Sequence, residues 1–193
     1  MLKQDFASEP EDPIGVLGRD RFHIPHLTPL QRFVIANILD EARGSAELDK
    51  DPNLDLIVDD ATMNQDEKTE FPERQETYRQ LILFPTGFGK SVCFQLPSLL
   101  LSGLTIVVYP LLALMNDQKR RLDEANIPCA LFRGGLSKEE WHEQEELITS
   151  GKATMVVVNP EILSAPKLRR FLNRFGIAHF VVDEAHCISE WGE

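Results

Sequence analysis

The string FPTGFGKS at residues 84–91 combines two glycines with a lysine and a serine, which are residue types that bind a phosphate chain. Gly87 and Gly89 let the backbone turn tightly and approach a phosphate, and the N–H groups of such a loop and of a following helix supply positive potential. We expect Lys90 to reach the β- and γ-phosphates of a nucleotide and Ser91 to bind Mg²⁺. The string therefore predicts nucleotide-binding residues, which are Thr86, Gly87, Phe88, Gly89, Lys90 and Ser91.

A second string, VVDEAH at residues 181–186, places two adjacent carboxylates directly after an apolar run. Asp183 is expected to hold Mg²⁺, directly or through water, and Glu184 to accept a proton from the attacking water. An Asp-Glu pair after an apolar strand is common, so this interpretation depends on the glycine-rich string upstream. Together the two strings predict a nucleotide-hydrolysing site with Lys90, Asp183 and Glu184 as its catalytic residues.

Four strings together resemble the superfamily 2 helicases and, within them, the RecQ family of DNA helicases. They are PTGFGKSVCFQLP (85–97), VVYPLLALMNDQ (107–118), NPE (159–161) and DEAHCISEWG (183–192). Phe84 stands at the first glycine position of the general GxxxxGK[ST] pattern, and the string matches the PTGxGK[ST] variant of helicase-like motors instead. The last string is the most specific, because other DEAH-type helicases do not usually follow the box with CIS-x-WG.

The resemblance implies an ATP-dependent motor that moves along single-stranded DNA, typically 3′ to 5′, and unwinds the duplex. It assigns Gln31 to adenine recognition, and it assigns His186 and Trp191 to the connection between hydrolysis and DNA. The structural alternatives are a solvated helix position for Gln31, a packing role for His186 and a half-buried core position for Trp191. The implied ligands are ATP, Mg²⁺ and single-stranded or duplex DNA.

The resemblance also implies that the chain stops inside a first RecA-like lobe, so that the second RecA-like lobe is missing. Hydrolysis by these residues alone is therefore expected to be very slow, because a transition-state arginine contributes about 10³–10⁵ in rate to related phosphoryl-transfer enzymes. Two positions depart from the family pattern. Thr28 stands where the family commonly has an arginine, and Tyr109 stands where it usually has a serine.

Two other functions stay open. The string TPLQ at residues 28–31 is reminiscent of DEAD-type RNA helicases, so an RNA-directed motor is one alternative. A non-catalytic nucleotide-binding remnant is the other. A kinase or a GTPase is disfavoured, because neither needs a DEAH string followed by an aromatic loop.

Short apolar runs alternate with helical stretches from residue 80 onward. The predicted strands are Leu81–Phe84, Thr105–Tyr109, Ala130–Phe132, Thr154–Val158 and His179–Val182, and the predicted helices are Ser91–Leu101, Leu112–Ala125, Ser137–Thr149 and Pro166–Phe175. This alternation predicts an α/β fold with a mostly parallel sheet and helices on both faces. In the family's terms this is a RecA-like P-loop NTPase domain, here truncated after the DEAH strand.

The residues before the glycine-rich string are less regular. Residues 1–20 are expected to be a flexible lead-in because they combine acids with Pro and Gly, and residues 21–193 are expected to form the ATP-binding domain. An amphipathic helix is predicted within residues 26–43, with Thr28 as its N-cap. Residues 41–76 are interpreted as an acidic surface insertion.

The net charge of −11 is unusual for a protein that binds nucleic acid. Residues 40–76 carry 13 acidic and 4 basic side chains, however, so one segment accounts for most of the excess. No apolar run is long enough to cross a membrane and no secretory leader is recognisable, so the expected location is the cytoplasm, with association to the nucleoid in a bacterium or location in the nucleus of a eukaryote. Three widely spaced cysteines suggest neither a disulfide framework nor a zinc site.

Overall fold

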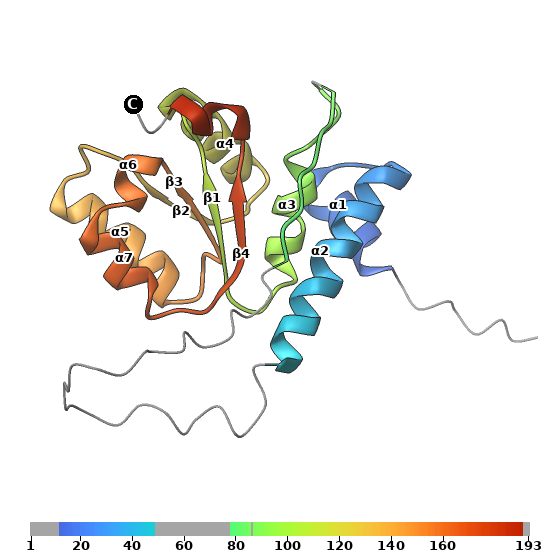
Figure 1. Ribbon diagram of the computed structural model, residues 1–193, viewed down its shortest axis with the longest axis horizontal. Helices are drawn as coiled ribbons and strands as arrows, with labels where there is room; N and C mark the ends of the chain where they lie inside the picture. The colour runs from blue at the N-terminus through green and yellow to red at the C-terminus, as the bar shows by residue number, and fades with distance from the viewer. Residues whose placement is uncertain (1–11, 49–77, 86, 191–193) are drawn as a thin grey trace, which may run out of the picture.

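The computed structural model describes residues 12–48, 78–85 and 87–190 (Figure 1). The α-helices are α1 (Pro13–Phe22), α2 (Pro29–Leu48), α3 (Val92–Gln95), α4 (Leu112–Glu124), α5 (Lys138–Thr149), α6 (Pro160–Leu163) and α7 (Pro166–Leu172). The strands are β1 (Leu104–Val108), β2 (Cys129–Phe132), β3 (Met155–Val158) and β4 (Ile177–Val182), and 3₁₀ turns follow α3 and β4 at Pro97–Leu99 and Ala185–Glu190.

The four strands form one parallel sheet in the order β2-β3-β1-β4. All residues of β1 and β3 are buried, which is why their sequences LTIVV and MVVV are apolar without alternation. Strands covered on both faces have this pattern, and parallel sheets bury both faces because their crossover helices lie there. The predicted strands at residues 105–109, 130–132, 154–158 and 179–182 are confirmed within a residue or two at each end.

Helices cover the two faces of the sheet, as the fold class requires. On one face, β-strand side chains such as Val156 and Phe132 pack with Ile148 of α5 and Leu168 of α7. On the other face, a second cluster joins strand side chains to α3 and α4, including Val107, Phe94, Met115 and Leu122. This arrangement confirms the predicted RecA-like α/β fold with helices on both faces.

Helices α1, α2 and α3 form a third packed group beside β4 (Figure 1). Ile35 and Leu96 lie fully buried at its centre. The expectation of a flexible lead-in through residue 20 is wrong for its last part, because residues 13–20 lie in α1. That helix begins where the Asp12 carboxylate accepts the Gly15 N–H at 3.1 Å and Pro13 occupies the first turn.

Two further expectations about the first half of the chain need correction. Helix α2 runs to Leu48, so the first residues of the predicted acidic insertion are helical; residues 49–76 of that insertion lie outside the described residues, as do residues 1–11. The predicted strand Leu81–Phe84 is absent from the sheet. Its side chains nevertheless alternate in burial, because Ile82 and Phe84 pack into the third group while Leu81 and Leu83 are 77% and 82% exposed.

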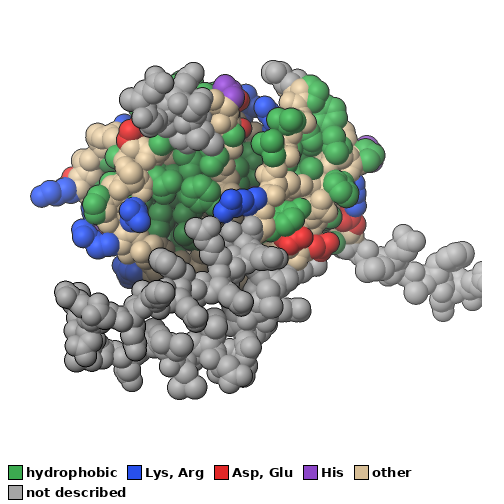
Figure 2. Space-filling view, in the orientation of Figure 1, with side chains coloured by type: hydrophobic (Ala, Val, Ile, Leu, Met, Phe, Trp, Pro, Cys, Tyr) green, Lys and Arg blue, Asp and Glu red, His purple; other side chains and the backbone are tan. Residues whose placement is uncertain are grey.

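Strand β4 is less covered than the other strands. Within the described residues it pairs with β1 alone, and Ile177 and Phe180 are each about half exposed. Figure 2 shows hydrophobic side chains gathered at this part of the surface. An open hollow of about 310 Å³ lies on the α6–α7 side, between Phe180, Val182 and Leu163. It is lined mainly by apolar side chains and contains none of the predicted site residues.

Cys93 and Cys129 are buried and Cys187 is half-buried, and all three are free thiols. Burial raises the pKa of Cys93 to about 11 and that of Cys129 to about 12, so both stay protonated at neutral pH and pack as small apolar groups. Among the helices that the structure describes, none combines the length and the apolar character that a membrane crossing requires.

Lowering the pH from 7.5 to 5.5 should destabilise the fold through His179. Its Nδ1 atom is buried without a hydrogen-bond partner, and burial lowers its pKa below the ordinary 6.5. The unfolded chain therefore binds the proton first, so stability falls as the pH drops below about 6.5 and is fully present above it. Urea unfolding midpoints at the two pH values should differ less in His179→Gln than in the natural chain, whereas His26→Gln, at an exposed position, should not change the difference.

Candidate active site

The glycine-rich loop adopts backbone angles that explain its glycines. Gly87 has φ 80° and Gly89 has φ 76°, in the left-handed region that other residues avoid. The Phe88 N–H donates to the Pro85 carbonyl at 3.2 Å, which closes a tight turn. Thr86, one of the predicted nucleotide-binding residues, lies outside the described residues.

The helix after the loop is shorter than predicted. Instead of one helix over residues 91–101, α3 has four residues and a 3₁₀ turn follows at Pro97, which cannot donate a backbone N–H to continue the helix. The helix dipole expected behind the loop is correspondingly reduced. Ser91 stands at the start of α3, and its side chain makes no capping hydrogen bond, so the hydroxyl is not committed to the helix.

Asp183 continues the path of β4 at the carboxyl end of the sheet. Its backbone N–H donates to the Val108 carbonyl at 3.0 Å, and its Oδ1 atom accepts the Glu184 N–H at 2.9 Å. Burial raises the pKa of this carboxyl, the Glu184 N–H bond lowers it, the Glu184 charge raises it, and the Lys90 charge lowers it. The charge of Lys90, which the sequence predicts to act together with Asp183, has the smallest of these four effects on the pKa. A cation beside Asp183 would stabilise its ionised form.

Glu184 occupies a strained position in the turn after β4. Its φ of 52° lies in the left-handed region, which is uncommon outside glycine and is associated with functional sites. The turn directs the chain into the 3₁₀ segment, where the Cys187 N–H donates to the Glu184 carbonyl at 2.9 Å. The Glu184 Oε2 atom lies 3.3 Å from His186 Nδ1, so two predicted site residues contact each other. Trp191, predicted to engage DNA, lies outside the described residues.

Gln31 contacts the glycine-rich loop at Phe88, and the sequence pattern did not predict this contact. It is 6% exposed, so the alternative of a solvated helix position is wrong. Its Oε1 atom accepts the Thr28 N–H at 2.8 Å, its own N–H donates to Thr28 Oγ1 at 3.3 Å, and its Nε2 atom donates to the Phe88 carbonyl at 3.0 Å. The first two bonds form a capping box at the start of α2, and Thr-x-x-Gln spacing could have indicated it.

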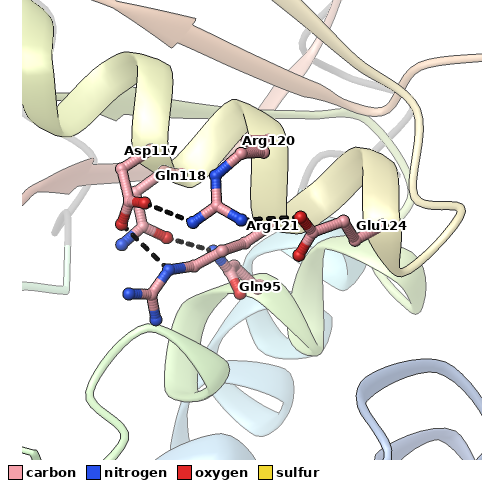
Figure 3. A network of polar contacts seen from close by, with 6 residues as sticks. All are labelled: Gln95, Asp117, Gln118, Arg120, Arg121 and Glu124. Atoms are coloured by element: carbon pink, nitrogen blue, oxygen red, sulfur yellow. Dashed lines mark hydrogen bonds and ion pairs between the residues drawn. The ribbon is translucent and has the colours of Figure 1, made fainter.

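A second unpredicted link joins the loop's helix to α4 (Figure 3). Gln95 of α3 donates from Nε2 to Gln118 Oε1 of α4 at 3.0 Å. Arg120 and Arg121, which follow Gln118, are held by Asp117 at 2.8 and 2.9 Å, and Arg120 also contacts Glu124. The amide bond ties the segment after the phosphate loop to the string at 107–118. The positive charges of Arg120 and Arg121 are paired with the carboxylates of Asp117 and Glu124, which lie on the same helix.

Tyr109, where the resembled family usually has serine, is a core residue. It is 1% exposed and packs in the cluster with α3 and α4. Burial raises the pKa of its hydroxyl far above the ordinary value, so it stays neutral. Tyr109 therefore contributes to the apolar core between the sheet and helices α3 and α4.

A magnesium site made only of protein side chains is not present in the described part of the chain, where no three His, Cys, Asp or Glu side chains cluster. Mg²⁺ in nucleotide sites is normally held by one or two protein oxygens together with phosphate oxygens and water. The Asp183 carboxylate and the Ser91 hydroxyl, which makes no capping hydrogen bond, are oxygen ligands of the kind that the protein supplies in such sites.

Comparison with known proteins gives the chain's family. The DEAD/DEAH box helicase family model matches residues 64–193, which is more than half of the chain. The chain belongs to the DEAD/DEAH box helicase family. This helicase-family chain is 39% identical over 110 residues to the ATP-dependent DNA helicase RecQ of Bacillus subtilis, a match that covers 57% of the chain and 19% of the relative.

Two eukaryotic relatives match a similar share of this DEAD/DEAH box chain. The RecQ-like DNA helicase blm-1 of Caenorhabditis elegans is 41% identical over 118 residues, covering 58% of the chain and 12% of the relative. The ATP-dependent helicase SGS1 of Saccharomyces cerevisiae is 39% identical over 120 residues, covering 58% and 8%. The resemblance to the RecQ family is confirmed, and the match spans less than a quarter of each of these relatives.

Proposed function

We propose that this chain carries the ATP-binding part of a RecQ-like DNA helicase, in which ATP hydrolysis drives 3′-to-5′ unwinding. The observation that carries the proposal is the glycine-rich loop itself, in which Gly87 and Gly89 adopt φ 80° and 76°, in a chain whose β4 ends at the carboxylate of Asp183. Ligands of open parallel sheets bind beyond the carboxyl ends of the strands, where Asp183 lies. The DNA substrate is proposed from the names of the relatives.

Each residue has a role that its chemistry supports. The loop residues 86–91, which include Lys90, would bind the phosphate chain, and Gln31 would bind the adenine. Ser91 and Asp183 would hold Mg²⁺, which when bound neutralises charge that develops on the β- and γ-phosphates. Glu184 would accept the proton of the attacking water. His186, in contact with Glu184, and Trp191 would connect this step to single-stranded DNA.

Replacing Lys90 with alanine should weaken Mg-ATP binding by about 10- to 100-fold, because charge-assisted hydrogen bonds contribute about 1.5–3 kcal/mol each. Calorimetric titration of the natural chain and the variant with Mg-ATP measures this change. Lys119→Ala, which removes a lysine of α4 paired with Asp123, should leave the affinity unchanged. Equal affinity of Lys90→Ala and the natural chain would exclude the proposed phosphate site.

The choice of nucleic acid is tested by ATP hydrolysis with and without single-stranded DNA or RNA, in a chain extended by the second RecA-like lobe that the resemblance implies, beside Lys90→Ala. Stimulation by DNA that disappears in the variant is the expected result. Stimulation by RNA alone would move the protein to the RNA helicases, an alternative suggested by the TPLQ string at 28–31. No stimulation by either polymer would leave a nucleotide-binding module without motor activity.

A further inference from the structure

The segment that contains α7 is strongly basic in an otherwise acidic chain. Residues 166–175 (PKLRRFLNRF) contain four basic and no acidic side chains, although the net charge of the whole chain is −11. The four are Lys167, Arg169, Arg170 and Arg174, and all of them are exposed. In Figure 2, Lys and Arg side chains gather on the part of the surface where Figure 1 places α7. This part of the surface can therefore attract an anion that the rest of the chain repels.

Three of these cations lie along one side of the segment. Lys167, Arg170 and Arg174 are spaced three and four residues apart, which places them on one side of a helix. The Arg174 N–H donates to the Phe171 carbonyl at 3.2 Å, so the chain keeps turning after Leu172, the last residue of α7. We call these three residues the α7 stripe. At a rise of 1.5 Å per residue it spans about 10 Å, roughly three nucleotide steps of a DNA strand.

The cations of the α7 stripe contact aromatic rings instead of carboxylates. Lys167 Nζ lies 4.0 Å from the centre of the Trp141 ring, and Arg174 Cζ lies 5.7 Å and 5.9 Å from the ring centres of Phe171 and Phe175. No residue of the stripe forms an ion pair with a carboxylate among the described residues. An aromatic ring orients a cation but does not cancel its charge. The positive charge is therefore held in place and remains available to a ligand.

Helix α4 shows the opposite arrangement. It also has three consecutive basic residues, Lys119, Arg120 and Arg121, but each of them contacts a carboxylate of the same helix, from Asp117, Asp123 or Glu124. Their charges are neutralised within α4. The difference between α4 and α7 is thus in the pairing of the cations, since both helices expose them.

The acidic helix α5 packs beside α7 but does not neutralise the stripe. Trp141, which contacts Lys167, lies on the side of α5 that faces the core. The exposed Glu143 and Glu146 are two and five positions from Trp141, which places them on the opposite side of the helix. Glu145 is on the same side as Trp141, and its carboxylate accepts the Trp141 Nε1–H at 2.7 Å.

We propose that the α7 stripe binds the phosphate backbone of duplex DNA. The stripe lies on the sheet face covered by α5 and α7, whereas α3, which follows the glycine-rich loop, packs on the other face, so this surface is separate from the ATP site. Oriented cations without carboxylate partners suit phosphates, and a duplex carries one negative charge per about 1.7 Å of axis, twice the density of a single strand. The inference rests on the proposed function for the choice of DNA as the anion.

The rings at the stripe favour a duplex over a single strand. Proteins that bind single strands stack bases on exposed aromatic side chains. Phe171 is buried, however, and Trp141 is half-buried beneath Lys167. Contacts of the stripe are therefore to phosphates, and phosphate contacts carry no direct information about base sequence. Binding should be independent of sequence and strongly dependent on salt.

The test is titration of a fluorescent blunt-ended duplex with the natural chain and with the double variant Arg170→Gln/Arg174→Gln, without nucleotide. Each phosphate contact contributes about 0.9 to the slope of log K against log salt. Loss of two contacts should lower that slope by about 1.8. Between about 50 and 200 mM salt the natural chain should therefore lose about tenfold more affinity than the variant, and the variant should bind more weakly at the lower concentration.

The matched control is Arg120→Gln/Arg121→Gln on α4, which changes the net charge equally. Because these arginines are already paired with carboxylates, the slope should stay at its natural value. Arg170→Lys/Arg174→Lys keeps the charge and should also keep the slope, which separates charge from packing. If the glutamine variant is unfolded by circular dichroism, Lys167→Gln decides, with an expected decrease of about 0.9.

Equal slopes for the natural chain and the folded glutamine variants would overturn the stripe as a DNA site. Tighter binding to single-stranded DNA, or to vesicles of phosphatidylserine, than to the duplex would overturn it as well. The titration contains no ATP, so its result does not depend on hydrolysis. Duplex binding through the stripe by a chain that fails to bind Mg-ATP would overturn the proposed function alone.

Discussion

Glu184→Gln should reduce ATP hydrolysis by about 10²–10⁴-fold, the usual contribution of a general base, while Mg-ATP binding is retained. Glutamine has nearly the same shape as glutamate but cannot take a proton from water. The substitution also keeps the side chain within reach of His186, which lies 3.3 Å from the natural carboxylate. Loss of turnover with retained binding would therefore identify a role in the chemical step.

Single-turnover hydrolysis of bound ATP and calorimetric binding separate these two effects. Asp183→Asn should behave differently, because loss of the proposed metal carboxylate weakens binding of the magnesium complex itself. Glu143→Gln, at an exposed position on α5, is the control for a general loss of negative charge. Hydrolysis by Glu184→Gln at the natural rate would remove Glu184 from the mechanism and leave the loop as a binding site only.

Phe132→Ala should lower the free energy of unfolding by about 3–5 kcal/mol. Phe132 is fully buried at the end of β2, with its ring centroid 4.9 Å from Trp141 and 6.4 Å from Phe171. The substitution therefore removes contacts from both α5 and α7 at once. Because domains are typically stable by about 5–15 kcal/mol, this one change would remove a large part of the total.

Urea unfolding followed by circular dichroism measures the effect. The matched control is Phe33→Ala on α2, where the same side chain is 61% exposed and the expected change is within about 0.5 kcal/mol. A loss at Phe132 no larger than the loss at Phe33 would contradict the packing described for the α5–α7 face.

The sheet could be predicted because each of its central strands has a continuously apolar sequence. Buried parallel strands need apolar side chains on both faces, and the runs at 104–108 and 155–158 satisfy this without any knowledge of their partners. The run at 81–84 has the same local character but no partner strand in the described residues, so pattern alone overestimated it. Helix α1 lies within the predicted flexible lead-in, because prolines and acids in that segment indicate a loop, although Asp12-Pro13 is also a typical helix start.

The features of the candidate site also differ in whether the sequence can predict them. The sequence predicts roles for Lys90 and Asp183 because the spacing of each motif fixes the chemistry that its residues can perform, and these roles stay predictions. The Gln31–Phe88 bond could not, since it joins residues 57 apart through the packing of α2 against the loop. Likewise, the strained backbone of Glu184 depends on how β4 turns into the next segment.

The strand order has a consequence for synthesis on the ribosome. Strand β1 lies between β3 and β4, and Thr105 is in register with Met155 and His179, which are both made much later. At translation rates of about 5–20 residues per second, the apolar run LTIVV waits roughly 4–15 s until the end of β4 has been added. β1 has no strand partner until β3 has been made, and one of its two edges stays unpaired until β4 follows, which leaves an exposed edge that can pair with other chains. The position of β1 between β3 and β4 thus makes completion of its hydrogen bonds depend on two strands that the ribosome adds later.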